Sequence, residues 1–178
     1  MEEKKAMFRD LRANEIDCRI SQINEKGLTL LLYKDARVDM DILDETVGAK
    51  NWQRTHTRDN ANCIVEIWDD EKKQWICKED TGTESFTEKE KGLASDSFKR
   101  AGFNWGIGRE LYTAPFIYVP VKDKEGYDNF ELKDKNNKLT TYTKFYVEAI
   151  QIINKEITGL SIKNDKGKRV FVYKKAGA

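Results

Sequence analysis

Three strand-like segments follow one another between residues 52 and 79, and the short connections between them constrain the fold most. Residues 52–58 alternate in polarity, residues 63–68 are rich in apolar side chains, and residues 74–79 complete the set. The connecting turns, residues 59–60 and 69–73, are much shorter than the roughly dozen residues that a parallel crossover needs. The three segments are therefore predicted to form an antiparallel meander.

An amphipathic helix is predicted directly after this meander. Thr87 and Glu90 have the spacing of a capping box, which satisfies free backbone N–H groups at a helix start. Four apolar residues then follow at steps of four, three and four, so that they share one face: Ala94, Phe98, Ala101 and Trp105. This face is predicted to pack on the sheet, giving a β-β-β-α core.

The remaining segments complete an α+β fold. Residues 2–14 are predicted to form a short helix, with Met7, Phe8 and Leu11 on one side. Strands are predicted at residues 16–20 and 28–33, and a helix at 37–47 with Gly48 as its C-terminal cap. Beyond Tyr112 the predicted strands are residues 116–119, 145–153, 157–163 and 169–173. We therefore expect a core domain over residues 1–112, and a β-hairpin extension of the same domain over residues 113–178.

Composition and charge restrict the class of protein. The formal net charge is only +1, but residues 133–178 hold 11 of the 32 Lys and Arg residues and only 4 of the 31 Asp and Glu residues. This asymmetry is a weak indication of a polyanionic partner, although a solvated lysine-rich surface explains it equally well. Three scattered cysteines, no apolar run of about 18 residues and no signal-like N-terminus predict a cytoplasmic protein without a membrane partner.

The sequence offers little catalytic chemistry. The single histidine, His56, stands between two threonines, and no group of Cys and His residues has the spacing of a zinc site. Gly102, Gly106 and Gly108 follow the predicted helix instead of opening one, and no Gly-Lys-Ser/Thr loop is present. We expect no catalytic residue, no metal ligand and no cofactor, and therefore a binding protein that is not an enzyme.

The side of the predicted helix opposite its apolar face carries the strongest functional pattern. In helical projection Phe103 lies there between Lys99 and Arg100. Cations that contact phosphates beside an aromatic ring that stacks on a base are typical of single-strand binding. The alternative is that Phe103 packs under the next segment or against another subunit, and that the two cations are only solvated.

Residues 91–112, with their Asp-x-x-Lys-Arg-Ala core followed by an aromatic residue and Gly, resemble the signature helix of the Rad-fifty-two family of single-strand annealing proteins. Phage-borne members of the Sak type are the most similar. Three upstream segments agree in order and spacing: residues 16–19 with Ile-x-x-Arg, residues 33–38 with Arg-Val, and residues 78–82 with Glu-Asp-x-Gly. The resemblance covers residues 8 to 112.

The resemblance implies a homo-oligomeric ring or helical filament that holds single-stranded DNA in a basic groove and anneals complementary strands without ATP. Its groove residues match Arg19, Lys99 and Arg100. We add Arg37, Lys91, Phe103 and Arg109 as expected DNA-binding residues. The implied setting is homologous recombination and repair in a bacterial host cytoplasm, at the nucleoid, with a host or phage single-strand-binding protein as a further partner.

The chain departs from the family at two points, and three different functions stay open. Eukaryotic members have a basic residue in place of Phe103, and the lysines of their duplex-DNA site have no clear counterpart here. A double-stranded RNA-binding module shares the α-β-β-β-α order of residues 37–112, but it places its lysines at the start of the last helix. The second is a metal-dependent nuclease whose carboxylates are brought together by folding. The third is an assembly factor that binds no nucleic acid.

Overall fold

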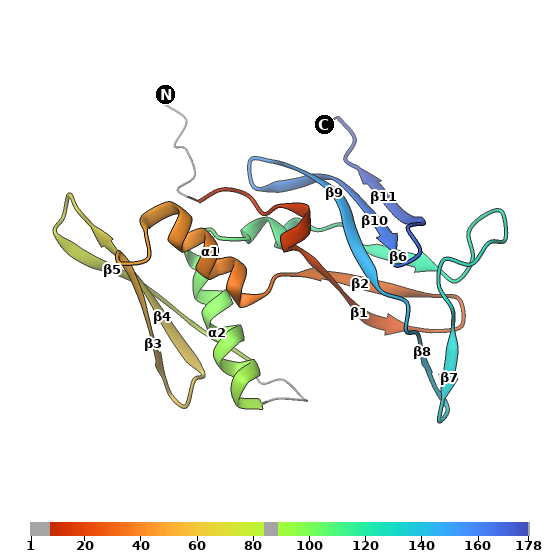
Figure 1. Cartoon of the computed structure of the whole chain (residues 1–178), viewed down its shortest axis with the longest axis horizontal. Coiled ribbons are helices and arrows are strands. Elements are labelled where there is room, and N and C mark those ends of the chain that lie inside the picture. Colours follow the sequence, from red (N-terminus) through yellow and green to blue (C-terminus); the bar gives the residue numbers. More distant parts are fainter. Residues whose placement is uncertain (1–7, 84–88, 178) are drawn as a thin grey trace. The chain divides into compact units, whose positions relative to one another are not determined.

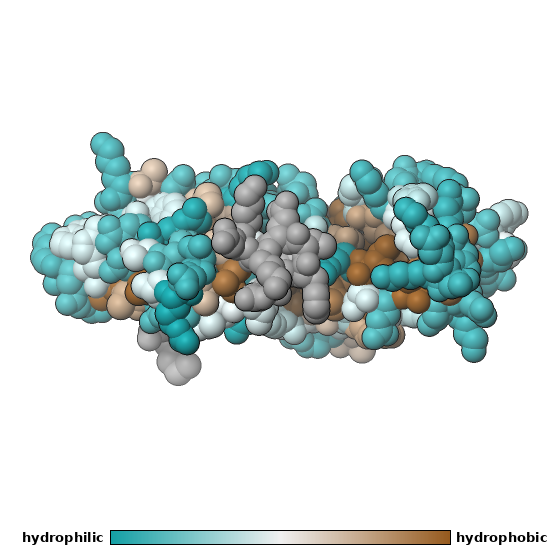
Figure 2. Space-filling model, turned by 90° about the horizontal axis from the view of Figure 1, so that it is seen from below, coloured by the Kyte–Doolittle hydropathy of each residue, from teal (hydrophilic) through white to brown (hydrophobic). Residues whose placement is uncertain are grey.

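The computed structural model describes residues 8–83 and 89–177, with side chains omitted at residues 89–91. By its internal contacts the chain divides into two units. The first unit comprises Met1–Asp10 and Asp35–Arg109, and the second comprises Leu11–Lys34 and Glu110–Ala178. The face seen in Figure 2 is mostly hydrophilic, and hydrophobic residues reach it in places.

The first unit combines two helices with a three-stranded antiparallel sheet (Figure 1). The sheet has the order β3-β4-β5, with β3 at Trp52–Thr57, β4 at Asn62–Asp69 and β5 at Gln74–Thr81. Helix α2 (Lys89–Trp105) contacts β4 and β5, and helix α1 (Ala36–Val47) contacts α2 and β3. The turn between β3 and β4 places Asp59 and Asn60 at positive φ, which short polar side chains tolerate well.

The second unit is built around a six-stranded sheet in which every neighbouring pair is antiparallel. Its order is β11-β10-β9-β1-β2-β6, so the N-terminal pair β1 and β2 lies between β9 and β6, which come later in the chain (Figure 1). The bounds are β1 Asp17–Ile23, β2 Gly27–Tyr33, β6 Ile117–Pro120, β9 Phe145–Ile153, β10 Glu156–Asn164 and β11 Arg169–Lys174. A hairpin of β7 (Lys133–Lys135) and β8 (Lys138–Thr140) and two short 3-10 helices, η1 (Ala13–Glu15) and η2 (Arg109–Thr113), complete the elements.

Strand alternation gives this sheet one buried face. On β2 and β6 the buried residues are Leu28, Leu30, Ile117 and Val119, and β10 adds Ile162. Their immediate neighbours along each strand point to the opposite face, because successive side chains of a strand alternate in direction. The chain is therefore α+β and rich in strands, in agreement with the fold class predicted from the sequence.

The N-terminal segment departs from its predicted helix. Residues 1–7 lie outside the described part of the chain, residues 8–12 are not helical, and only Ala13–Glu15 form a 3-10 turn. Phe8 and Leu11 are nevertheless both buried. A tertiary contact competes with the helix, because the backbone N–H of Leu11 donates to Oε1 of the buried Glu110 at 2.7 Å.

The predicted end of the helix over residues 37–47 is confirmed. Gly48 follows α1 at φ +84 and donates its N–H to the carbonyl oxygen of Asp44. Gly106 (φ +96) and Gly108 (φ +69) follow α2, where the chain leaves the helical path. Such backbone angles favour glycine, so these residues belong to a helix terminus. The predicted capping residue Thr87 lies outside the described residues.

Candidate functional site

Helix α2 is held on the sheet by an aromatic and cationic cluster. Phe98 is fully buried, and its ring stacks on Trp52 with 6.1 Å between centroids. The guanidinium of Arg54 lies 4.6 Å from the same ring. At the end of the helix, Trp105 donates from Nε1 to the carbonyl oxygen of Val65 at 3.1 Å. These contacts fix which side of α2 faces away from the sheet.

The end of β5 is joined to α2 by side-chain hydrogen bonds. Lys78 Nζ donates to the carbonyl oxygen of Asn104 at 2.7 Å and lies 4.7 Å from the ring centroid of Trp105. Asn104 in turn donates from Nδ2 to the carbonyl oxygen of Glu79 at 3.0 Å and to Asp80 Oδ2 at 3.2 Å. Two segments that carry separate sequence motifs, residues 78–82 and 91–112, therefore form one connected structure.

Gly82 completes this junction by allowing a close backbone approach. A Cβ atom at this position would lie 2.5 Å from the backbone nitrogen of Ser97 and 2.9 Å from the carbonyl oxygen of Leu93. Only a residue without a side chain permits that distance. The glycine of the Glu-Asp-x-Gly segment is therefore a packing residue beside α2.

Arg100 and Lys99, the two adjacent cations of α2, have different environments. Arg100 donates from Nε to Asp80 Oδ1 at 3.2 Å and remains part-exposed. This bond turns the guanidinium toward β5, whereas helical projection places it beside Phe103 on the outward side. Lys99 is half-buried and makes no ion pair or hydrogen bond with any residue that the structure describes. Lys99 is therefore the more available of the two charges.

Two further arginines differ in how strongly they are held by the protein. Arg109 caps α2, because its Nε and Nη2 donate to the carbonyl oxygen of Phe103 at 3.0 and 2.8 Å, and Nη2 also donates to that of Asn104 at 3.1 Å. Arg37 is 86% exposed at the start of α1, with its Nε 4.0 Å from Asp35. Arg37 can reach a ligand freely, whereas Arg109 has a structural task.

The other three residues predicted to bind DNA lie in different environments. Phe103 is half-buried and has an interaction partner. Lys91 belongs to α2, but its side chain lies outside the described part of the chain. Arg19 is exposed on β1 and therefore belongs to the second unit, whereas the other six predicted residues belong to the first.

Burial shifts the pKa values of two titratable groups of the first unit, His56 and Cys63. His56 Nδ1 lies 3.4 Å from Ser97 Oγ, and desolvation followed by the charge of Arg54 lowers the pKa of the imidazole. Burial raises the pKa of the Cys63 thiol to about 11. Within residues 8–83 and 89–177, no group of three or more His, Cys, Asp or Glu side chains is placed to hold a metal ion. Among these same residues no helix is both long and apolar enough to cross a membrane.

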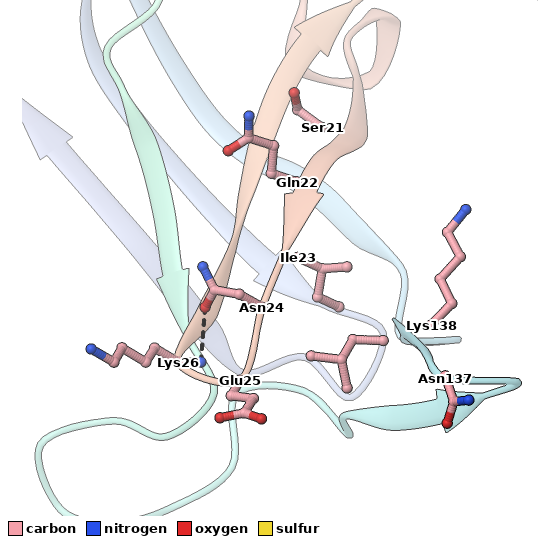
Figure 3. A pocket seen from close by; sticks show the side chains of 9 residues that line it. Ser21, Gln22, Ile23, Asn24, Glu25, Lys26, Asn137 and Lys138 are labelled. Atoms are coloured by element: carbon pink, nitrogen blue, oxygen red, sulfur yellow. Dashed lines mark hydrogen bonds between the residues drawn. The ribbon is translucent and has the colours of Figure 1, made fainter.

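A surface hollow of the second unit lies between the β1–β2 turn and the β7–β8 hairpin (Figure 3). Its volume is about 920 Å³, and its lining runs from Ser21 to Lys26 and from Asn137 to Leu139. The side chain of Asn24 folds back to accept from the backbone N–H of Lys26 at 2.8 Å. Glu25 and Lys26 point away from the hollow, so no convergent set of polar groups marks it as a small-molecule site.

Sequence reasoning missed two structural features of the candidate site. In the sequence Asp80 is only one position of a motif, yet in the fold it holds Arg100 and Asn104. The exposed aromatic side chains of the six-stranded sheet were also missed, although strand alternation places them on one face. Comparison of the chain with protein-family models, with curated proteins and with solved structures finds no match.

Proposed function

We propose that the chain binds single-stranded DNA and promotes the ATP-independent annealing of complementary strands. The observation that carries the proposal is the position of Lys99 on α2. The lysine of the Asp-x-x-Lys-Arg-Ala segment has no described ion pair, while the arginine beside it is held by Asp80. A fixed helix thus presents one available cation beside one oriented cation, an arrangement suited to successive phosphates.

The β-β-β-α arrangement also supports the proposal. The family resemblance implies a meander packed on a signature helix, and the first unit contains three antiparallel strands in contact with α2. Hydrogen bonds join the two segments that carry the resemblance, at residues 78–82 and 91–112. Groove residues in this proposal are Lys99, Arg100 and Arg37, with Lys91 and Phe103 as further candidates in the same unit. Arg19 is a separate candidate on the second unit, and Arg109 is assigned to capping α2.

A nearly neutral chain needs repetition to bind a polyanion. The net charge is only +1, so a single subunit offers few phosphate contacts. A head-to-tail interface repeats those contacts around a ring or along a filament and produces a continuous cationic track. The proposed active form is therefore a homo-oligomer, acting in bacterial or phage recombination in the host cytoplasm beside a single-strand-binding protein.

Annealing itself requires no nucleotide. Base pairing releases about 1.4 kcal/mol per stacked step, so the annealed product is already favoured. The protein has to neutralise phosphate repulsion and keep the bases of both strands accessible. ATP-independent action therefore follows from the same cationic groups that bind a single strand.

The test of strand binding compares Lys99→Ala with Lys73→Ala, an equal loss of charge on an exposed lysine in the β4–β5 turn. Binding to a fluorescent oligonucleotide is titrated at several salt concentrations. Lys99→Ala should weaken binding and reduce the slope of log K against log salt by about 0.7, as expected for one lost phosphate contact. An effect of the same size in Lys73→Ala would show that net charge, and not this site, governs binding.

Annealing is tested with complementary fluorescent oligonucleotides, with and without ATP and magnesium. Acceleration in both conditions is expected, whereas acceleration that requires ATP would contradict the mechanism. Duplex RNA serves as the competing ligand, because preference for it would favour a double-stranded RNA-binding module. Degradation of labelled DNA with magnesium or manganese would instead indicate a nuclease.

A further inference from the structure

One face of the six-stranded sheet carries most of the exposed large hydrophobic side chains. Eleven such residues occur in the described part of the chain, and seven of them belong to this face. We call it the outer face. Its hydrophobic members are Leu31, Tyr33, Phe116, Tyr118, Tyr146, Ile153 and Val172.

Strand register places these side chains together. Asp17 pairs with Tyr33 on one side and with Tyr146 on the other, and paired residues of antiparallel strands point to the same face. Thr29 pairs with Tyr118 in the same way. Tyr146 is 46% exposed, so its ring is available to a ligand.

Phe116 is the most exposed residue of the outer face, at 78%. It stands directly before β6 and lines a shallow hollow of about 420 Å³ together with Leu31, which is 57% exposed. Tyr118 lies beside this hollow, with its hydroxyl directly over Gly27, where a Cβ atom would come within 2.5 Å. Aromatic and aliphatic surface is therefore continuous across β2 and β6.

Cations are interspersed with these rings. Arg19 pairs in register with Leu31, Lys163 pairs with Tyr146, and Lys174 pairs with Gly159 on the same face. None of the three makes a salt bridge or hydrogen bond within the described part of the chain, although the charge of Lys163 also acts on Glu148. The strands β9, β10 and β11 lie beyond the part of the sequence that resembles annealing proteins, whereas Arg19 lies within it.

Most acidic groups of the outer face are already neutralised. Glu148 accepts from Arg169 at 2.6 Å and from Ser161 at 3.0 Å, and these bonds lower the pKa of its carboxyl group. Glu156 is paired with Lys175. Asp17 is the remaining carboxylate, so the cations of this face outnumber its unpaired anions.

The two units also differ in overall charge. The second unit holds 17 of the 32 Lys and Arg residues and 12 of the 31 Asp and Glu residues, a net charge of +5. The first unit, with the remaining 15 and 19, has a net charge of −4. A polyanion is therefore attracted to the second unit as a whole.

We infer that the outer face binds single-stranded nucleic acid by stacking bases on Phe116, Tyr118 and Tyr146, with Arg19, Lys163 and Lys174 contacting phosphates. This inference rests on the proposed function and adds a base-contacting surface to it. Sheets that present aromatic side chains are an effective platform for unpaired bases, and stacking on a ring does not depend on base identity. Such a surface suits annealing, which must accept any sequence.

A second copy of the chain fits this face less well. A self-complementary interface would bury Arg19, Lys163 and Lys174 against a face that offers few unpaired carboxylates. Burying an unpaired charge is strongly unfavourable, whereas phosphates would pair with all three. Charge complementarity therefore favours the polyanion.

The experiment compares two fluorescent probes, an oligothymidine and an abasic oligonucleotide of equal length, so that base and backbone contributions separate. The variant Phe116→Ser/Tyr146→Ser should lose affinity for oligothymidine by about tenfold per stacked base. Its affinity for the abasic probe and its salt slope should be unchanged. The matched control is Tyr127→Ser, which removes a similarly exposed tyrosine from a loop of the same unit.

The outcomes separate this inference from the proposed function. Loss of oligothymidine binding in the outer-face variant, with Tyr127→Ser normal, supports the inference whatever Lys99→Ala does. Normal binding in the outer-face variant alongside weakened binding in Lys99→Ala overturns the inference and retains the function. A changed oligomeric state with unaltered DNA affinity identifies the face as a contact between copies and also overturns it. If the unmodified chain binds neither probe, the inference and the proposed function are both rejected.

Discussion

Asp80 Oδ1 accepts a hydrogen bond from Arg100 Nε at 3.2 Å, and this pair connects the last residues of β5 to the middle of α2. Asn104 shares the same carboxylate through Oδ2. The pair orients the guanidinium and also offsets part of its charge. Asp80 therefore affects both the stability of the first unit and the charge that α2 presents.

Replacing Asp80 should change stability and DNA affinity in opposite directions. Asp80→Ala removes three hydrogen bonds that the carboxylate accepts, from Arg100, Asn104 and the backbone N–H of Thr81. The site is part-exposed, so we expect a loss of about 1 kcal/mol in the free energy of unfolding. Single-strand affinity should rise, because Arg100 is released and a negative charge is lost. Denaturant titration and fluorescence anisotropy measure the two effects. A fall in affinity in the folded variant would show that Arg100 must be held by Asp80 to act.

Gly82→Ala should destabilise the first unit. The added Cβ would come within 3 Å of backbone atoms of α2, which cannot move as a flexible side chain can. Overpacking of this kind typically costs about 1–3 kcal/mol. Gly159→Ala on β10 is the control, because its closest contact would be the side chain of Gln151, at 3.2 Å. Thermal unfolding of both variants should show a lower midpoint for Gly82→Ala alone.

Arg109 should prove to be a helix cap. Its three hydrogen bonds reach the carbonyl oxygens of Phe103 and Asn104 at the end of α2. These oxygens also accept from the backbone N–H of Gly106 and from Lys78 Nζ. Arg109→Ala should lower stability by about 1 kcal/mol, and Arg109→Lys should recover only part of it. DNA affinity measured well below the unfolding temperature should change little. A reduced salt slope in Arg109→Ala would instead indicate a phosphate contact.

Thiol reactivity should distinguish the three cysteines. Cys77 is exposed, whereas burial raises the pKa of Cys18 to about 12 and that of Cys63 to about 11. Near neutral pH a thiol reagent should modify one cysteine rapidly and the others only after unfolding. Cys77→Ser should abolish the rapid phase, and its persistence would contradict the structure.

The same thiols set a dependence of stability on pH. Both folded-state values lie above the ordinary pKa of 9.0, so the unfolded chain releases these protons first. Their contribution is complete below pH 9.0 and is lost as the pH rises through the folded-state values. Denaturant midpoints measured below and above pH 9.0 should show that stability falls as the pH rises. Cys18→Ala should make this fall smaller.

The chain should self-associate. Light scattering should report a species larger than the 20.7 kDa single chain at micromolar concentration. The reason is that a nearly neutral subunit gathers enough phosphate contacts only by repetition. Electron microscopy with and without an oligonucleotide then shows the form of the assembly. A single-chain species that DNA leaves unchanged would remove this part of the proposal.

Local patterns in the sequence predicted most elements but not their partners. Alternation and short turns located the strands of residues 52–79, and Gly48 located the end of α1, because both signals act over a few residues. The contact between Leu11 and Glu110 spans 99 positions, and nothing in residues 2–14 reveals it. Helical projection likewise placed Arg100 outward, because it cannot include an acceptor such as Asp80 on a neighbouring strand.

For the candidate site, too, the sequence predicted local features but not the contacts between distant residues. Sequence spacing identified Lys99 and Arg100 as adjacent cations, but only the fold distinguishes the available one from the paired one. The outer face was recoverable in principle, since alternation on β9 and β10 exposes Tyr146 and Lys163. Its coherence depends on the order of six strands, which pairs Asp17 of β1 with Tyr146 of β9 from opposite ends of the sequence.

In the second unit, β1 and β2 lie between strands that come much later in the chain, and this order has a consequence for synthesis. β1 and β2 leave the ribosome early, but their neighbours β9 and β6 follow only after the whole of residues 35–109. The first unit can fold while the nascent hairpin of β1 and β2 still has two open edges, which are a template for unwanted pairing. Shielding of residues 17–33 until the C-terminal strands arrive is therefore the step at which production of this chain is most vulnerable to aggregation.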